Sequence, residues 1–169
     1  MTDVRAATAA DLDAIVALHH AAFGRPAEGD LVRRLVDGGK ASISLVAVDD
    51  DDTVLGHVLF SPVTVESGDD GKALGMAPVA VHPEHQRQGI GRELIEEGIG
   101  ACFVADARAV FVLGSPAYYN GFGFIKASAH GLHDAFEGGN AFQVLPLTID
   151  GLAGYGGRVD YASEFSEGL

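Results

Sequence analysis

The sequence has one cysteine, few cations and no long uncharged apolar run. The single thiol, Cys102, cannot form an internal disulfide, so folding does not depend on an oxidising compartment. There are 11 Lys and Arg against 24 Asp and Glu, a formal net charge of −13. This charge argues against a nucleic-acid partner, because nucleic-acid-binding proteins hold phosphates with Lys and Arg. Since neither a membrane-spanning run nor an N-terminal signal sequence is found, we predict a cytoplasmic protein without a membrane partner.

The length and composition are those of a folded domain. The chain has 169 residues, 47% of them hydrophobic and 21% charged, which is enough for a core without disulfides. We therefore predict a single domain over residues 1–169. Cys102 lies in an apolar helical pattern, which predicts a buried structural thiol. The negative net charge requires any anion site to be built locally, whereas a cationic substrate would suit the field of the protein.

Two helices are predicted near the N-terminus. The first covers residues 8–23, with Thr8 as its N-cap and apolar residues at helical spacing. The second lies within residues 29–39 and ends at Gly38–Gly39.

Three strands follow these helices. The first two flank an acidic turn, Asp49–Asp52, which we expect to be a solvated hairpin tip. The third, residues 73–81, contains Pro78, which cannot donate a hydrogen bond to a ladder. We expect a bulge or a separation of strands at this proline.

The second half of the chain begins with a helix over residues 91–107, followed by a short strand, a short helix starting at Pro116 and a last strand over residues 142–149. The stripe on the longer helix comprises Ile90, Leu94, Ile95, Gly98, Ile99 and Cys102. An interior glycine costs about 1 kcal/mol relative to alanine, so we expect Gly98 and Gly100 to allow close packing on a sheet. The order of helices and strands predicts one mixed α/β sheet.

The segment VAVHPEHQRQGIGREL, residues 79–94, leads from an apolar strand through a polar loop into a helix. The first N–H groups of a helix have no internal partner and carry the positive end of its dipole. Gly89 and Gly91 let an anion approach the backbone and permit positive φ values. The segment therefore predicts an anion site.

Two other classes of glycine-rich loop can be compared with these residues. A Walker A loop ends in Gly-Lys-Ser/Thr, but Gly91 is followed by Arg92 and Glu93, which excludes it. A dinucleotide-binding loop has a third small residue where this chain has Leu94, and it usually follows the first strand of a domain. A glycine turn without a ligand stays open on these residues alone.

The same segment resembles the diagnostic motif of the GNAT superfamily of N-acetyltransferases, Val-x-Pro-x-x-Gln/Arg-x-x-Gly-x-Gly/Ala. A second motif of that family, Tyr-x-x-x-Gly-Phe, is matched after the following strand. The matching residues are Val81, Pro83, Gln86, Gly89, Gly91, Tyr119, Gly123 and Phe124. The resemblance covers most of the chain, and VLGSPAYYNGFGF is similar to a subgroup of small bacterial predicted acetyltransferases.

This resemblance implies an α/β GNAT fold, a single mixed, mostly antiparallel, twisted sheet flanked by helices and splayed between its fourth and fifth strands. It also implies acetyl-CoA as the co-substrate. The pyrophosphate would lie on the backbone N–H groups of Arg87, Gln88, Gly89, Ile90, Gly91 and Arg92. Main-chain groups of Val79 and Val81, with Ala80 between them, would hold the pantetheine arm, and an N–H near Val79 could polarise the thioester carbonyl.

By the same resemblance the protein is an acyltransferase that acetylates a primary amine by direct attack in a ternary complex. Tyr119 matches the tyrosine that commonly protonates the CoA thiolate in this family. A phenol, with a pKa of about 10, is protonated at neutral pH and can serve. A non-catalytic acyl-CoA-binding module is the alternative function. The amine acceptor stays unidentified, and a homodimer stays open as the assembly.

The general base is where the sequence departs from the family. Many relatives carry a glutamate six residues before the Val81 position, where this chain has Gly75. The remaining candidates are an ordered water, Glu28 in the loop between the first two helices, His57 and Ser115.

Two histidines precede the glycine loop. His82 and His85 have a spacing that could suggest a metal, but no further ligand pattern accompanies them. We therefore expect exposed histidines and no metal site.

Overall fold

The computed structural model describes residues 1–166. These residues form two compact units. The first comprises Met1–Ser61, Ala77–Ala101 and the chain from Ser163, and the second comprises Pro62–Met76 and Cys102–Ala162. A single domain over residues 1–169 stays a prediction, and residues 167–169 lie outside the described part.

The strands of the first unit lie in the order β1-β2-β3-β5. Their bounds are β1 Asp3–Ala6, β2 Ile43–Val48, β3 Val54–Pro62 and β5 Ala73–Val81. β2 pairs antiparallel with β1 and with β3, which places Val46 opposite His57. The predicted strands around the acidic turn and over residues 73–81 are confirmed. β1 is not among the predicted strands, because four residues give too short a pattern to identify a strand.

Two helices lie between β1 and β2: α1, Leu12–Phe23, and α2, Ala27–Asp37. Both were expected, but Thr8 caps a short 3-10 turn, η1 (Ala9–Asp11), from which α1 continues. α2 begins earlier than predicted, because Pro26 with its φ of −81° already has helical geometry. Glu28 therefore lies in the first turn of α2 and not in a loop, which corrects that expectation.

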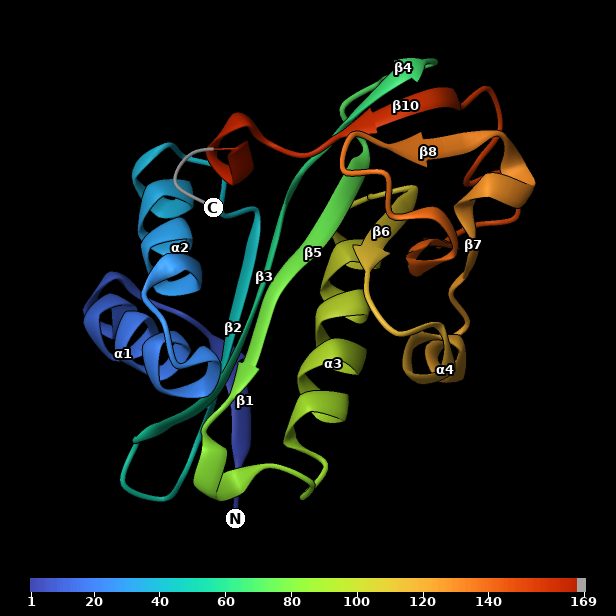
Figure 1. Ribbon diagram of the computed structural model, residues 1–169. Helices are drawn as coiled ribbons and strands as arrows, with labels where there is room; N and C mark the ends of the chain where they lie inside the picture. The colour runs from blue at the N-terminus through green and yellow to red at the C-terminus, as the bar shows by residue number, and fades with distance from the viewer. Residues whose placement is uncertain (167–169) are drawn as a thin grey trace. The chain divides into compact units, whose positions relative to one another are not determined.

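The helix α3, Ile90–Val104, and the α1–α2 pair cover opposite faces of the first unit's strands (Figure 1). Side chains alternate along a strand, so Gly56 and Phe60 of β3 face α3 while His57 faces α1. A β-carbon on Gly56 would lie 2.8 Å from Cδ1 of Leu94, and one on Gly98 would lie 2.7 Å from Cζ of Phe60. One glycine from each element thus brings helix and sheet close together.

The predicted stripe on α3 is confirmed. Ile90, Leu94, Ile95, Gly98 and Cys102 are buried, and Ile99 is half-buried. Burial raises the pKa of the Cys102 thiol to about 12, as expected for a structural cysteine. The expectation of close packing is wrong for Gly100, which is exposed and has nothing within 4 Å of the place of a β-carbon.

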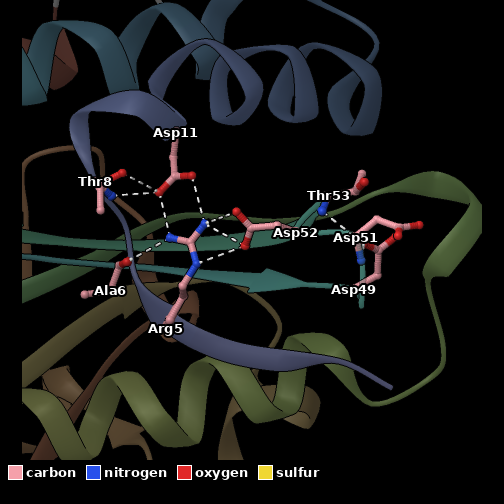
Figure 2. A network of polar contacts seen from close by, with 8 residues as sticks. All are labelled: Arg5, Ala6, Thr8, Asp11, Asp49, Asp51, Asp52 and Thr53. Carbon is pink, nitrogen blue, oxygen red and sulfur yellow. Dashed lines mark hydrogen bonds and ion pairs between the residues drawn. The ribbon is translucent and has the colours of Figure 1, made fainter.

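Arg5 of β1 connects η1 with the turn between β2 and β3 (Figure 2). Its guanidinium donates to both carboxylate oxygens of Asp11, at 2.8 and 3.0 Å, and to Asp52 at 3.1 Å. Asp11 also accepts from the Thr8 amide at 2.7 Å. Arg5 holds the pKa of Asp11 well below its usual range. The acidic turn lies at the surface as predicted, but Asp52 is tied to β1.

The second unit contains two sets of strands. The start of β5 pairs in parallel with β6 (Ala109–Leu113), and β9 (Phe142–Pro146) and β7 (Ile125–Lys126) follow by antiparallel pairing. The parallel ladder runs from Ala73 to Gly75 of β5, opposite Ala109 to Phe111. β4 (Thr64–Ser67), β10 (Gly156–Asp160) and β8 (Leu132–Asp134) lie side by side as a second sheet (Figure 1).

Short helical turns connect these strands. They are η2 (Pro83–His85), α4 (Pro116–Tyr119), η3 (Asn120–Phe122), η4 (Ala127–His130), η5 (Gly139–Ala141) and η6 (Ser163–Ser166). The core of the second unit includes Val63, Phe111, Phe142 and Tyr155.

The predicted class, a mixed and mostly antiparallel α/β fold, is confirmed, but the protein has a second, three-stranded sheet in addition to the single sheet expected. The ladders are antiparallel except for β5–β6 and β8–β10 among the pairs described. β4, β7, β8 and β10 add to the prediction, because strands of two to five residues carry little periodicity. The bond between Ala77 and Pro78 in β5 is a cis peptide. Among residues 1–166, no helix has the length and apolar character needed to cross a membrane.

Candidate active site

The loop between β5 and α3 is closed by side-chain hydrogen bonds to its own backbone. The Gln86 amide nitrogen donates to the Val81 carbonyl at 3.1 Å, across the turn η2. His82 caps η2, because its Nδ1 accepts from the Glu84 amide at 3.2 Å. The His82 amide in turn donates to Leu55 of β3 at 2.8 Å. The motif glutamine therefore holds the loop against the end of β5.

Two residues of the loop have left-handed backbone conformations. Gly89 has a φ of +87°, which a glycine adopts without cost, and Arg87 has a φ of +64°. A non-glycine residue in this region is strained by about 1 kcal/mol or more. Gly91 lies within the helix α3 and not in the turn. The requirement for positive φ thus applies to Gly89, while the missing side chain of Gly91 leaves room for an approaching group.

The helix α3 begins directly after the loop. The amide of Glu93 donates to the carbonyl of Gly89 at 3.0 Å, which closes the first turn of α3. By helix geometry the amides of Ile90 and Gly91 precede the first intrahelical bond. Residues 86–89 are exposed, whereas the Ile90 side chain is buried. The buried anchor fixes the helix start while the amides before it stay accessible to an anion.

Two arginines in and directly after the loop supply local positive charge in a protein whose net charge is −13. Arg87 and Arg92 are exposed, and Arg92 forms an ion pair with Glu96 one turn further along α3, at 3.0 Å. Exposed pairs of this kind are worth little and exchange partners easily. Both arginines can therefore contribute positive charge beside the amides.

The last residues of β5, which lead into the loop, alternate in burial. Ala80 is buried, and its carbonyl lies 3.3 Å from the place of a β-carbon on Gly56 of β3. Val79 and Val81 alternate with it and are half-buried. The three residues therefore form the last part of β5, directly before the loop.

Tyr119 belongs to the second unit and ends the short helix α4. Its ring packs on Gly114, where a β-carbon would lie 3.1 Å from Cδ2 of the tyrosine. The Tyr119 ring centroid lies 5.0 Å from that of Tyr118 and 5.7 Å from that of Phe124. Burial, and next the charge of Tyr118, raise the pKa of Tyr119 above its usual value of 10. Tyr119 is therefore a neutral, half-buried phenol at physiological pH.

His57, a candidate base in the sequence, is fully buried and hydrogen bonded at both ring nitrogens. Its Nδ1 lies 2.9 Å from Nε2 of His19, and its Nε2 lies 2.8 Å from Oγ of Ser44. Burial and the neighbouring His19 lower the pKa of His57 well below its usual value. His57 is therefore part of the core of the first unit.

The other candidate bases have different surroundings. Glu28 forms an ion pair with Arg25, which lowers its pKa and keeps it ionised. Ser115 is exposed and is the N-cap residue of α4. At Gly75 a β-carbon would collide with the ring of Tyr161, so this strand position has no room for a side chain. The sequence offers no local signal for Tyr161, because the residue lies in the glycine-rich tail, far along the chain from Gly75.

The histidines before the loop are brought together with a carboxylate. One ligand atom each of His82, Glu84 and His85 lies within 4.8 Å of the others. Glu84 is exposed and the two imidazoles are half-buried, so the expectation of fully exposed histidines is too simple. His82 already accepts the Glu84 amide with Nδ1, which leaves only Nε2 for another partner.

Comparisons with known proteins agree with these features. A family model described as "Acetyltransferase (GNAT) domain" matches residues 3–127. The chain is 41% identical over 157 residues to the N-acetyltransferase YhbS of Escherichia coli K12, covering 92% of this chain and 93% of that protein. It is 39% identical over 106 residues to the N-acetyltransferase YjhQ of the same strain, covering 61% of this chain and 58% of YjhQ.

Solved structures give the same result. The crystal structure of Escherichia coli YhbS in complex with CoA has a TM-score of 0.94 at 38% identity, covering 99% of this chain and 93% of that chain. A GNAT family acetyltransferase from Brucella melitensis, in complex with acetyl-CoA, has a TM-score of 0.82 at 33% identity and covers 98% of both chains. The resemblance seen in the sequence is confirmed, and the chain belongs to the GNAT family of N-acetyltransferases.

Proposed function

We propose that this N-acetyltransferase binds acetyl-CoA at the loop between β5 and α3 and transfers its acetyl group to a primary amine. The observation that carries the proposal is the exposed loop of residues 86–89 at the start of α3, where Gly89 takes a positive φ. A pyrophosphate has the charge and the acceptor oxygens that such amides bind. That YhbS was crystallised with CoA, and the Brucella melitensis relative with acetyl-CoA, supports the same choice of co-substrate.

The end of β5 would hold the rest of the cofactor. Val79, Ala80 and Val81 lead directly into the loop, so a ligand bound at both places would run along the strand. The cofactor would bind only backbone groups here, so the buried side chain of Ala80 does not prevent binding. An N–H near Val79 would stabilise negative charge on the thioester oxygen during attack.

Tyr119 would serve as the general acid. In the transfer, the amine nitrogen bonds to the acetyl carbon, the carbon–sulfur bond breaks, and the sulfur leaves with the bonding electron pair. A thiol has a pKa of about 8.5, and the pKa of Tyr119 is raised, so the phenol is protonated when the thiolate forms. Tyr119 gives its proton to the sulfur and recovers one from solvent, while the amine nitrogen loses one proton. The products are the acetylated amine and CoA.

The test is the release of the CoA thiol, followed with a thiol-reactive dye, in the presence of acetyl-CoA and a panel of amines. Cadaverine, spermidine, glycylglycine and aniline cover alkyl, α-amino and aromatic nitrogen. We expect at least one of them to accelerate CoA release above the rate with acetyl-CoA alone, with formation of the acetylated amine in equal amount. Tight binding of acetyl-CoA without release for any amine would instead support an acyl-CoA-binding module.

A further inference from the structure

Two histidines and a glutamate gather at the turn η2, directly before the proposed cofactor loop. One ligand atom each of His82, Glu84 and His85 lies within 4.8 Å of the other two. The two imidazole rings meet edge to face, with their centroids 5.8 Å apart. All three residues belong to the first unit. Among the residues that the structure describes, no other three His, Cys, Asp or Glu side chains come together in a way that suits a metal ion.

The geometry of η2 explains why the two histidines meet. A 3-10 helix has about three residues per turn, so side chains three positions apart lie above one another. His82 and His85 have this spacing, and the His85 amide donates to the His82 carbonyl at 2.8 Å. Pro83 takes the first position of the turn, where its fixed φ suits helical geometry. The sequence His-Pro-Glu-His therefore places two imidazoles on one side of the turn.

Hydrogen bonds to both neighbouring strands hold the turn in place. The His82 amide donates to the carbonyl of Leu55 in β3 at 2.8 Å. The Gln86 side chain donates to the carbonyl of Val81 in β5 at 3.1 Å. Because the backbone of the turn is already fixed, an ion bound there has less chain to order, and this lowers the cost of binding.

The spacing of the three side chains suits a small tetrahedral ion. Zinc binds imidazole nitrogen and carboxylate oxygen at about 2.0–2.2 Å, so two ligand atoms on one ion lie about 3.4 Å apart. From separations within 4.8 Å, each pair has to approach by about 1.4 Å at most. Glu84 is exposed and the two imidazoles are half-buried, so rotation of the side chains supplies this movement.

The donor atoms and the surrounding charge select the class of ion. Two imidazoles with one carboxylate are a known set of protein ligands for zinc, whereas Mg²⁺ and Ca²⁺ prefer oxygen ligands. The acidic turn Asp49–Asp52 precedes β3, and it lies at the same end of the strands as η2 (Figure 1). Its negative charge attracts cations to this end of the first unit.

We propose that His82, Glu84 and His85 together bind one Zn²⁺ or a similar divalent transition-metal ion, with water in the remaining coordination position. Nδ1 of His82 accepts the Glu84 amide, so His82 would bind the ion through Nε2. This site replaces the expectation of no metal. It does not depend on the proposed function, because the three side chains take no part in the acetyl transfer.

The test is a calorimetric titration of the untagged, full-length protein with Zn²⁺, after removal of metal with a chelator and without acetyl-CoA. We expect one ion per chain. His85→Gln and Glu84→Gln each remove one ligand and keep a polar side chain of similar size. Loss of even a second-shell partner weakens a metal site by about 10- to 100-fold, so the Kd for Zn²⁺ should rise about a hundredfold or more in either variant.

A third variant separates binding of the ion from capping of the turn. Asparagine is among the best N-cap residues, so His82→Asn keeps an acceptor for the Glu84 amide and removes the imidazole. We expect the same loss of zinc affinity in His82→Asn. A Kd for Zn²⁺ equal to that of the wild type would show that His82 is only a cap, and it would overturn the three-ligand site.

His130 and His133 provide the matched control. Both are exposed, they have the same spacing of three, and they lie in the second unit. The double variant His130→Gln/His133→Gln should keep the wild-type Kd for Zn²⁺, and an excess of Mg²⁺ should not displace the zinc. Absence of zinc binding in the wild type, or loss of binding only in the double variant, would overturn the proposal. Binding of Mg²⁺ as tight as that of Zn²⁺ would also contradict a site built from imidazoles.

Discussion

Nε2 of His19 and Nδ1 of His57 lie 2.9 Å apart, and both residues are fully buried in the first unit. Nε2 of His57 continues the chain to Oγ of Ser44 at 2.8 Å. Among residues 1–166, no group hydrogen bonds to Nδ1 of His19. A buried acceptor without a partner costs less than a buried N–H without one, so His19 donates through Nε2 to His57, and His57 donates to Ser44. Both imidazoles are neutral in this arrangement.

This pair should make the protein sensitive to mild acid. Burial lowers the pKa of His19 to about 4, although Glu28 opposes the shift and His20 adds to it. The unfolded chain takes up the proton near the ordinary pKa of about 6.5, so it binds more protons than the folded protein between pH 6.5 and 4. Stability is complete above pH 6.5 and falls as the pH is lowered through this range. For His19 alone we expect a loss of about 3 kcal/mol, measured by urea unfolding at pH 7.5, 5.5 and 4.5.

Two controls separate this effect from other titrations. His130→Gln changes an exposed histidine outside the pair and serves as the control variant. Asp11 and Asp70 have lowered pKa values, so their contributions are lost only below about pH 4. A free energy of unfolding that stays constant from pH 7.5 to 5 would contradict the neutral pair.

A negative charge at the start of α3 should abolish cofactor binding. Gly91→Glu places a side chain and a carboxylate beside the amides proposed to hold the pyrophosphate. We expect at least a hundredfold weaker binding of acetyl-CoA by calorimetry. Gly100→Glu adds the same residue to the same helix at an exposed position with nothing nearby, and its Kd should stay close to wild type. Tight binding by Gly91→Glu would show that the loop assignment is wrong.

Removing the hydroxyl of Tyr119 should slow the chemical step. A positioned acid contributes about a hundredfold or more, so Tyr119→Phe should lower kcat by about that factor and leave the Kd for acetyl-CoA unchanged. Tyr118→Phe changes the adjacent, exposed phenol and serves as control. Wild-type turnover in Tyr119→Phe would remove Tyr119 from the role of acid.

The two interior glycines of α3 should respond in opposite directions to alanine. Gly100→Ala adds a methyl group to an open, helical position and should stabilise the protein by about 1 kcal/mol. Gly98→Ala would press a methyl group against the Phe60 ring and should destabilise it. Urea unfolding of both variants measures the difference. Equal effects would contradict the packing described for Gly98.

The loop of the proposed cofactor site was accessible to prediction because its features are local. The first amides of α3, the positive φ of Gly89 and the start of the helix all lie within residues 86–93. Residue types at fixed spacing in the sequence are enough to predict such a site. The same holds for the stripe on α3, whose buried positions follow from a period of 3.6 residues.

The base candidates show where sequence reasoning fails. His57 was considered as a base from its position on a strand, but packing against His19 places it in the core. Glu28 was expected in a loop, whereas α2 begins before it, after Pro26, and Arg25 forms an ion pair with its carboxylate. The surroundings of each residue depend on a contact with another part of the chain, and hydrophobic periodicity does not identify that contact.

The sequence by itself determined the family, the class of fold and the loop that would hold the cofactor, because these depend on short-range patterns of glycine, amide and apolar residues. Only the tertiary structure decided which side chains meet across the chain: Tyr161 on Gly75, and His57 with His19 and Ser44. These contacts set burial, and burial controls the ionisation of a phenol or an imidazole. The protonation of these buried groups is therefore a property of the packing and not of any single stretch of sequence.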